Sequence, residues 1–183
     1  MTKVILASTS PRRKEILSRI VKNFETVSPD ASEITEGDPL FVAEKNATLK
    51  GRSVSSEGAI VIACDTVVSL DGVIYGKPGS FENAVRTLSV LAGKTHEVTG
   101  GVYIAKEGEE KIFAVRSFVT LKKLTPQEIN DYVRIYRPFD KAGAYGIQDG
   151  VVTESYVGDY DNIVGLPAGK IREVLYEFGF GEK

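Results

Sequence analysis

The chain has 183 residues, of which 42% are hydrophobic and 26% charged, and its formal net charge is −2. This length suits one domain, expected to span residues 1–183, and the acidic balance disfavours a surface for DNA or RNA. The single cysteine, Cys64, excludes an intrachain disulfide framework and a cysteine-cluster zinc site, and no apolar segment is long enough for a membrane span or signal sequence, so we expect a cytoplasmic protein.

The chain begins with an apolar strand at residues 3–7, followed by a hydroxyl-rich turn and a helix. Ser10 is the predicted N-cap, with proline at the first helical position. Arg12 and Arg13 then fall in the first turn, where unpaired N–H groups and the helix dipole favour anions over cations. We therefore expect a phosphate there, held by the helix N–H groups, the arginines, and the hydroxyls of Ser8 and Ser10.

The next segments are a strand at residues 24–28, an acidic loop to Asp38, and a helix of about 15 residues from Pro39. Glu33 lies in the acidic loop, where a solvated carboxylate is the alternative to a functional one. Lys50 lies on the long helix, where an ordinary exposed lysine is the alternative to a ligand-binding one.

A continuous apolar run at residues 59–64 predicts a buried strand that ends at Asp65 and Thr66. A carboxylate at the carboxyl end of a buried strand is typical of ligand sites in open α/β sheets, although a capping aspartate is an equal alternative. With Glu33, Asp65 makes a pair of carboxylates, and such a pair beside a polyphosphate can hold Mg²⁺ or Mn²⁺.

Asp71-Gly72 predicts a hairpin between strands at residues 67–70 and 73–75. Lys77 follows it and precedes a proline, so its amine could reach a phosphate, with a surface lysine as the alternative. A helix at 81–91 with Ser80 as its cap, a β-hairpin at 96–105 and 111–121, and a helix from a capping box at Thr125 to about Arg134 come next. The only histidine, His96, lies in this hairpin and is expected to be structural, as is Cys64 in the core.

In the last quarter, residues 141–148 alternate glycine and alanine around Tyr145, which leaves backbone open to a planar ligand. Gln148 offers a donor and an acceptor that suit a pyrimidine edge, whereas the alternative for this segment is a bulged edge strand. A strand at 151–157, a shaped loop at 158–167 and a terminal helix at 167–178 follow. Because strands and helices do not alternate regularly, we expect an α/β fold with a mixed sheet flanked by helices.

Taken together, these motifs resemble one family, the Maf proteins, which are nucleoside triphosphate pyrophosphatases first described in connection with septum formation. The resemblance covers nearly the whole chain and rests on these segments in order: Leu6-Ala-Ser-Thr-Ser-Pro-Arg-Arg13, Glu33, Lys50, Ala63-Cys-Asp-Thr-Val-Val68, Gly76-Lys-Pro78, Thr95-His-Glu-Val-Thr-Gly100, Lys141-Ala-Gly-Ala-Tyr-Gly-Ile-Gln148 and Asn162-Ile-Val-Gly-Leu-Pro167. The last two segments resemble the branch that acts on dTTP and UTP.

The resemblance implies an elongated fold similar to inosine triphosphate pyrophosphatases, with a cleft between two lobes, and metal-dependent hydrolysis of a nucleoside triphosphate to monophosphate and pyrophosphate. It implies a divalent cation, Mg²⁺ or Mn²⁺, held by Glu33 and Asp65, with Asp65 as the catalytic base or metal-bound activator of water. The residues implied to bind the triphosphate are Ser8, Arg12, Arg13, Lys50 and Lys77, and those associated with substrate choice are Arg12, Thr66 and Gln148.

The implied ligands are pyrimidine nucleoside triphosphates, with no nucleic acid and no membrane, and a homodimer remains open. The chain departs from the family pattern at Gly51, where alanine is expected and glycine weakens the helix, and at Ala168-Gly169 after the last motif. Two other functions stay open: a nucleotide-binding regulator linked to septum formation without turnover, and nucleic-acid binding through Arg12, Arg13 and Lys14.

Overall fold

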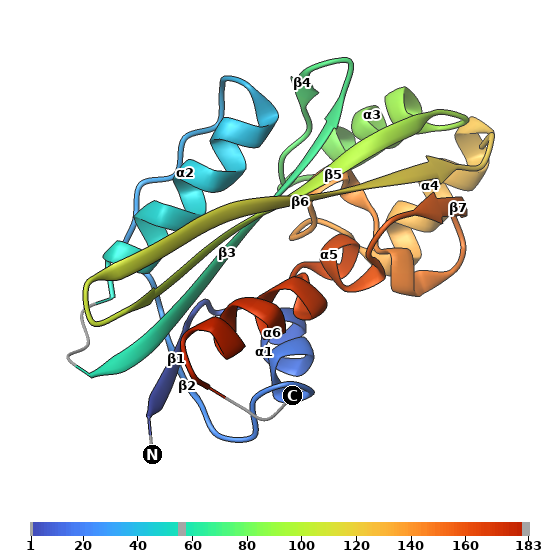
Figure 1. Ribbon diagram of the computed structural model, residues 1–183. Helices are drawn as coiled ribbons and strands as arrows, with labels where there is room; N and C mark the ends of the chain where they lie inside the picture. Colours follow the sequence, from blue (N-terminus) through green and yellow to red (C-terminus); the bar gives the residue numbers. More distant parts are fainter. Residues whose placement is uncertain (1, 55–57, 181–183) are drawn as a thin grey trace.

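The computed structural model describes residues 2–54 and 58–180, and within them seven strands form one mixed sheet (Figure 1). The strands are β1 (Lys3–Ala7), β2 (Glu25–Val27), β3 (Ala59–Leu70), β4 (Val73–Ile74), β5 (Thr95–Lys106), β6 (Glu109–Leu121) and β7 (Thr153–Val157). Their order is β2-β1-β3-β5-β6-β7, with β4 paired to β3 beside this path. β1 runs parallel to both neighbours, whereas β3, β5, β6 and β7 are successively antiparallel.

Helices cover both faces of this sheet. They are α1 (Pro11–Ser18), α2 (Pro39–Arg52), α3 (Phe81–Leu91), α4 (Pro126–Tyr136), α5 (Tyr160–Val164) and α6 (Ala168–Glu177), with short 3₁₀ turns η1 (Ala142–Ala144) and η2 (Ile147–Asp149). Figure 1 shows α2 on one face of the long strands and α1 with α6 on the other, while α3 and α4 lie at the far end. In the part of the chain that the structure describes, no helix has the length and apolar character needed to cross a membrane.

The alternation of side chains along β3 decides which helix each residue faces. Ile62 and Cys64 pack in the core that α1 and α6 cover, whereas Ala63 packs in the separate cluster under α2. Since successive strand residues point to opposite faces, Asp65 faces α2 and Thr66 faces α1. One strand thus sends two neighbouring polar side chains to helices on opposite faces of the sheet.

The sheet edge opens beside these two residues. On one edge of β3, β1 pairs as far as Ile62, and the antiparallel pairing with β4 involves Ser69 and Leu70. Asp65 and Thr66 lie between these two paired stretches, while their other edge is hydrogen-bonded to β5. The gap leaves room for a ligand against the centre of a long buried strand.

The predicted mixed sheet flanked by helices is confirmed, and several elements are as expected. The helix at residues 81–91 has its predicted Ser80 cap, and Thr125 forms the predicted capping box of α4. The prediction that the strand beginning at residue 59 ends at Asp65 and Thr66 is wrong, because β3 continues to Leu70 as a strand of 12 residues. Ladder pairing with β5 carries it through Asp65, which therefore lies within the strand and not at its carboxyl end.

Two glycines of β5 allow helices to approach the sheet closely beside Asp65. A Cβ on Gly101, the partner of Asp65 in the β3 ladder, would overlap the backbone carbonyl of Ala43 in α2. A Cβ on Gly100 would overlap the side chain of Asn162 in α5 on the opposite face. The glycine pair therefore brings α2 and α5 within reach of the centre of β3.

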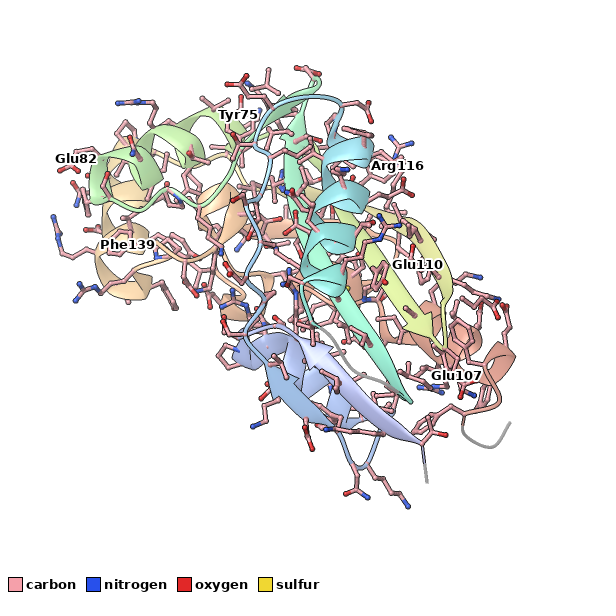
Figure 2. All side chains as sticks on the ribbon, turned by 90° about the vertical axis from the view of Figure 1, so that its left-hand side faces the viewer. Tyr75, Glu82, Glu107, Glu110, Arg116 and Phe139 are labelled. Carbon is pink, nitrogen blue, oxygen red and sulfur yellow. The ribbon has the colours of Figure 1, made fainter. Side chains whose placement is uncertain are left out.

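Gly51 has a packing role that explains its departure from the expected alanine. A Cβ there would overlap the ring of Tyr103, whose hydroxyl is held by Glu110 at 2.8 Å. Figure 2 shows Glu110 beside α2, where it also accepts hydrogen bonds from Arg52. The ring consequently has little freedom to move away from the helix.

We expect Gly51→Ala to destabilise the protein by about 1–3 kcal/mol, because overpacking against Tyr103 outweighs the gain in helix propensity. Gly169→Ala in α6 is the matched control, since a Cβ there meets nothing within 4 Å and the helix should gain stability. Urea unfolding of both variants measures the difference. Equal stabilisation by the two alanines would contradict the packing role of Gly51.

Candidate active site

The buried centre of the opening is an ion pair between Asp65 of β3 and Lys50 of α2. The Nζ of Lys50 lies 2.5 Å from Oδ1 of Asp65, and both side chains are 9% exposed. The same Nζ lies 3.1 Å from Oε1 of Glu33, whose side chain is 45% exposed. Because a buried charge is unfavourable unless it is paired, Lys50 is the group that allows two carboxylates to approach one another here.

Asp65 has a second partner on the same helix. Asn46, one turn before Lys50, donates a hydrogen bond from Nδ2 to Oδ2 of Asp65 at 3.1 Å. Residues four apart lie on one face of a helix, so α2 supplies one donor to each carboxylate oxygen. The carboxylate is thereby fixed in orientation, and each oxygen keeps a lone pair for a further ligand.

The two arginines of α1 have partners from distant parts of the chain. Nη1 of Arg12 lies 3.1 Å from Oδ2 of Asp140. Arg13 donates from Nε to the carbonyl of Gly165 at 2.9 Å and from Nη2 to the hydroxyl of Thr66 at 3.1 Å. These acceptors offset the placement of two cations at a helix start that has no acidic residue in its first turn.

The pairing with Arg12 also changes the titration of its partner. Partial burial acts to raise the pKa of Asp140, but hydrogen bonds from Arg12 and Lys141 outweigh it and lower the pKa. Asp140 is therefore ionised at neutral pH and keeps Arg12 near the cleft. A phosphate bound at the start of α1 has to share the arginine with this carboxylate.

These groups line one cleft of about 520 Å³, a size typical of sites for small molecules. Eight of the nine site residues that the resemblance implies line it: Arg12, Arg13, Glu33, Lys50, Asp65, Thr66, Lys77 and Gln148. The ninth, Ser8, is 5% exposed and lies behind the lining, where its hydroxyl accepts hydrogen bonds from the backbone N–H of Ser10 and from Arg13. The structure thus brings the predicted residues together, with Ser8 as a support of the helix start.

The wall of the cleft that carries Gln148 is formed by residues of the segment 140–148. Tyr132 of α4 supports this wall. Its hydroxyl accepts from the N–H of Gly146 at 3.0 Å and donates to Oδ2 of Asp149 at 2.6 Å. Burial raises the pKa of Tyr132, so the hydroxyl remains a donor at neutral pH. The segment forms the turns η1 and η2, and the alternative of a bulged edge strand is wrong.

His96 supports the same wall from β5. It is 1% exposed, and its Nε2 shares a hydrogen bond of 2.8 Å with the hydroxyl of Tyr145, which lines the cleft. Burial lowers the pKa of His96 from 6.5 to about 4, so the ring is neutral at physiological pH. The expected core position of Cys64 is also confirmed, since it is 0% exposed and burial raises its pKa to about 12.

This histidine makes stability depend on pH. Between about pH 6.5 and about pH 4 the unfolded chain binds a proton at His96 that the folded protein does not, so stability falls as the pH falls. From about pH 7.5 to about pH 4.5, we expect wild type to lose about 2 kcal/mol more than His96→Gln, which cannot titrate. Urea unfolding at both pH values measures this, and equal losses in the two proteins would refute it.

The donor set of the cleft fits a magnesium-type ion better than zinc. In residues 2–54 and 58–180, no group of three or more His, Cys, Asp or Glu side chains forms a metal-binding cluster. Glu33 and Asp65 instead approach one cation, Lys50, and both line the cleft. Mg²⁺ is commonly held by one or two carboxylates together with substrate phosphates and waters, and this arrangement offers those carboxylates.

Two residues of the site were not predicted as functional. Asn46 could have been found as a polar residue amid the buried Val42, Ala43 and Ala47 of α2. Asp140 carries no such signal, because its contact with Arg12 joins residues 128 positions apart. Only the folded chain shows that the first helix and the wall carrying Gln148 share an ion pair.

The fold and the cleft define a class of protein: a mixed α/β protein whose cleft is lined by several cations and opens against the middle of its sheet. Residues 3–178 match the family described as Maf-like protein, and the chain belongs to that family.

Several curated relatives are similar over nearly the whole chain. A dTTP/UTP pyrophosphatase of Thermococcus onnurineus is 47% identical over 184 residues, which cover 97% of this chain and 98% of the relative. A dTTP/UTP pyrophosphatase of Thermosipho africanus is 43% identical over 180 residues, with 97% and 94% covered. One of Porphyromonas gingivalis is 38% identical over 188 residues, again with 97% and 94% covered.

Proposed function

We propose that this protein hydrolyses dTTP and UTP to the nucleoside monophosphate and pyrophosphate. The observation that carries the proposal is the buried ion pair of Asp65 and Lys50. This pair lines a cleft to which further cations also contribute. Its similarity to relatives named dTTP/UTP pyrophosphatase supports the same reaction and these substrates. The acidic net charge supports a free nucleotide, held by local cations, over a nucleic acid.

Asp65 is the proposed catalytic base, which takes a proton from the attacking water. Lys50 and Asn46 each donate to one of its oxygens, so the carboxylate is oriented before the substrate binds. No rotation of the carboxylate is then needed at the moment of proton transfer. The pairing of β3 with β5 fixes the backbone of Asp65, and the two donors from α2 fix its side chain.

The cations of the cleft are proposed to bind the triphosphate. Lys77 contributes an exposed amine, and Arg12 and Arg13 contribute the guanidinium N–H groups that their protein partners leave free. Fixed positive groups stabilise the charge that develops on phosphate oxygens during transfer. Ser8 supports this region through its bonds to Ser10 and Arg13.

A divalent cation, Mg²⁺ or Mn²⁺, is the proposed cofactor, and Glu33 with Asp65 would hold it together with the phosphates. When bound, such an ion neutralises phosphate charge and makes a bound water easier to deprotonate. The exposed Glu33 can turn toward such an ion, whereas the buried Asp65 is held in place.

The pyrimidine base is proposed to lie against the wall that carries Gln148. Its amide offers both a donor and an acceptor, and the cleft is also lined by Val68, Val98 and Ile163, whose apolar surfaces suit a flat ring. Arg13 donates a hydrogen bond to the hydroxyl of Thr66. A residue proposed to bind the triphosphate therefore contacts a residue proposed to influence substrate choice.

A panel of nucleoside triphosphates tests this function. With Mg²⁺ or Mn²⁺ present, kcat/KM for dTTP and UTP should exceed the values for ATP and GTP by about tenfold or more. One well-placed contact between the protein and the base can supply discrimination of that size. Equal or higher values for the purine nucleotides would overturn the substrate assignment. A nucleotide-binding regulator without turnover would instead bind dTTP and release it unchanged.

A further inference from the structure

The loop that carries Glu33 is tied to the protein at very few points. Residues 29–37 form no helix or strand between β2 and α2. Among the described residues, every hydrogen bond or ion pair that this loop makes ends on Asn46 or Lys50 of α2. Apolar contact adds to this, since Ile34 packs against the cluster of Val42.

Of these hydrogen bonds and ion pairs of the described residues, only those of Asn46 reach the backbone of the loop. Its Oδ1 accepts from the N–H of Ile34 at 2.8 Å, and its Nδ2 donates to the carbonyl of Ile34 at 2.9 Å. The side-chain amide of Asn46 therefore pairs with the backbone of Ile34 as a neighbouring strand would. These two hydrogen bonds fix the orientation of the Asn46 amide. Asn46 is 3% exposed, so water does not compete for these bonds.

The same amide reaches Asp65. The second N–H of Nδ2 donates to Oδ2 of Asp65 at 3.1 Å, so both N–H groups are used and both acceptors are protein atoms. A leucine at position 46 would make none of these bonds. An aspartate would keep only the acceptor for the N–H of Ile34 and would place its other oxygen against two acceptors.

We propose that Asn46 is a positioning residue that joins the Glu33 loop to Asp65 and thereby sets the relative placement of the two carboxylates. The inference rests on the proposed function, in which these carboxylates serve one reaction. Asn46 acts through Asp65 and through the backbone of Ile34. Loss of the amide lets the loop and Glu33 drift from the cleft while the fold of the sheet remains.

Steady-state kinetics with dTTP and Mg²⁺ test the inference in Asn46→Leu. We expect kcat to fall by about 10- to 100-fold, the effect of a misplacement on the order of 1 Å, while KM changes by less than about threefold. The matched control is Thr48→Val on the same helix, since the buried hydroxyl of Thr48 bonds only to the carbonyl of Glu44 among the described residues. It should shift the urea midpoint and leave kcat unchanged.

A double-mutant cycle with Glu33→Gln identifies the route of the effect. If Asn46 acts by placing Glu33, the two substitutions together lower kcat by clearly less than the product of their separate effects. Fully multiplicative effects would overturn the link to the loop. Asn46→Asp provides a second variant if the leucine variant does not fold, and it should lower kcat while the amide of Ile34 stays protected from hydrogen exchange.

The outcome separates this inference from the proposed function. Full activity of Asp65→Asn would overturn the assigned base whatever Asn46 does. An inactive Asp65→Asn together with wild-type kcat in both Asn46 variants would overturn only the positioning role of Asn46.

Discussion

Replacing Asp65 by asparagine is expected to lower kcat for dTTP by about 10²- to 10⁴-fold, the usual contribution of a general base. Asparagine has nearly the same shape and can still accept a hydrogen bond from Lys50, which also remains paired with Glu33. The protein should therefore fold, with an unchanged circular dichroism spectrum and a cooperative urea transition. The defect is then one of chemistry and not of structure.

The control for this substitution is Asp71→Asn, the same change at the exposed turn where β3 ends. Asp71 has a φ of 52°, which asparagine adopts readily, so kcat and stability should stay at wild-type values. Near-normal turnover by Asp65→Asn under the same conditions would show that the assigned base is wrong.

Replacing Lys50 by methionine should have the second large effect, on both stability and activity. The change keeps the length of the side chain but removes the cation shared by Asp65 and Glu33, leaving a buried carboxylate without its ion pair. Removal of one partner of a buried pair typically costs 3–5 kcal/mol, and we expect about 3 kcal/mol because Glu33 can turn to solvent. We also expect kcat/KM for dTTP to fall by at least about 10²-fold.

Lys45→Met provides the comparison, since Lys45 is an exposed lysine on the same helix. Urea unfolding and initial rates should show wild-type behaviour for Lys45→Met and both losses for Lys50→Met. The same small change in stability for the two variants would mean that the ion pair of Lys50 does not support the cleft.

Local signals in the sequence predicted much of the fold, because they depend on neighbouring residues. Ser80 and Thr125 cap helices where expected, since a side-chain oxygen three positions before a free N–H is sufficient. α5 was predicted as part of a loop, and its five residues are too few to show a periodic pattern. β3 passes through Asp65 because its pairing with β5 outweighs the local preference of aspartate, which a single strand does not reveal.

The candidate site was predicted as a set of residues, but not as a set of contacts. The resemblance to the Maf proteins indicated Glu33, Lys50 and Asp65, and the structure places them in one cleft. The sequence could not show that Lys50 is buried between the two carboxylates. Nor could it show that Arg13 donates hydrogen bonds to Gly165 and Thr66. Such contacts depend on how α1 and α2 pack on opposite faces of β3.

The bond that is cleaved tests the proposed function most directly. Purified protein is incubated with dTTP and Mg²⁺, and the products are separated by anion-exchange chromatography, with Asp65→Asn run in parallel. The proposed function predicts dTMP and pyrophosphate in equal amounts from wild type and almost none from the variant. Release of dTDP and orthophosphate, or equal product from both proteins, would contradict it.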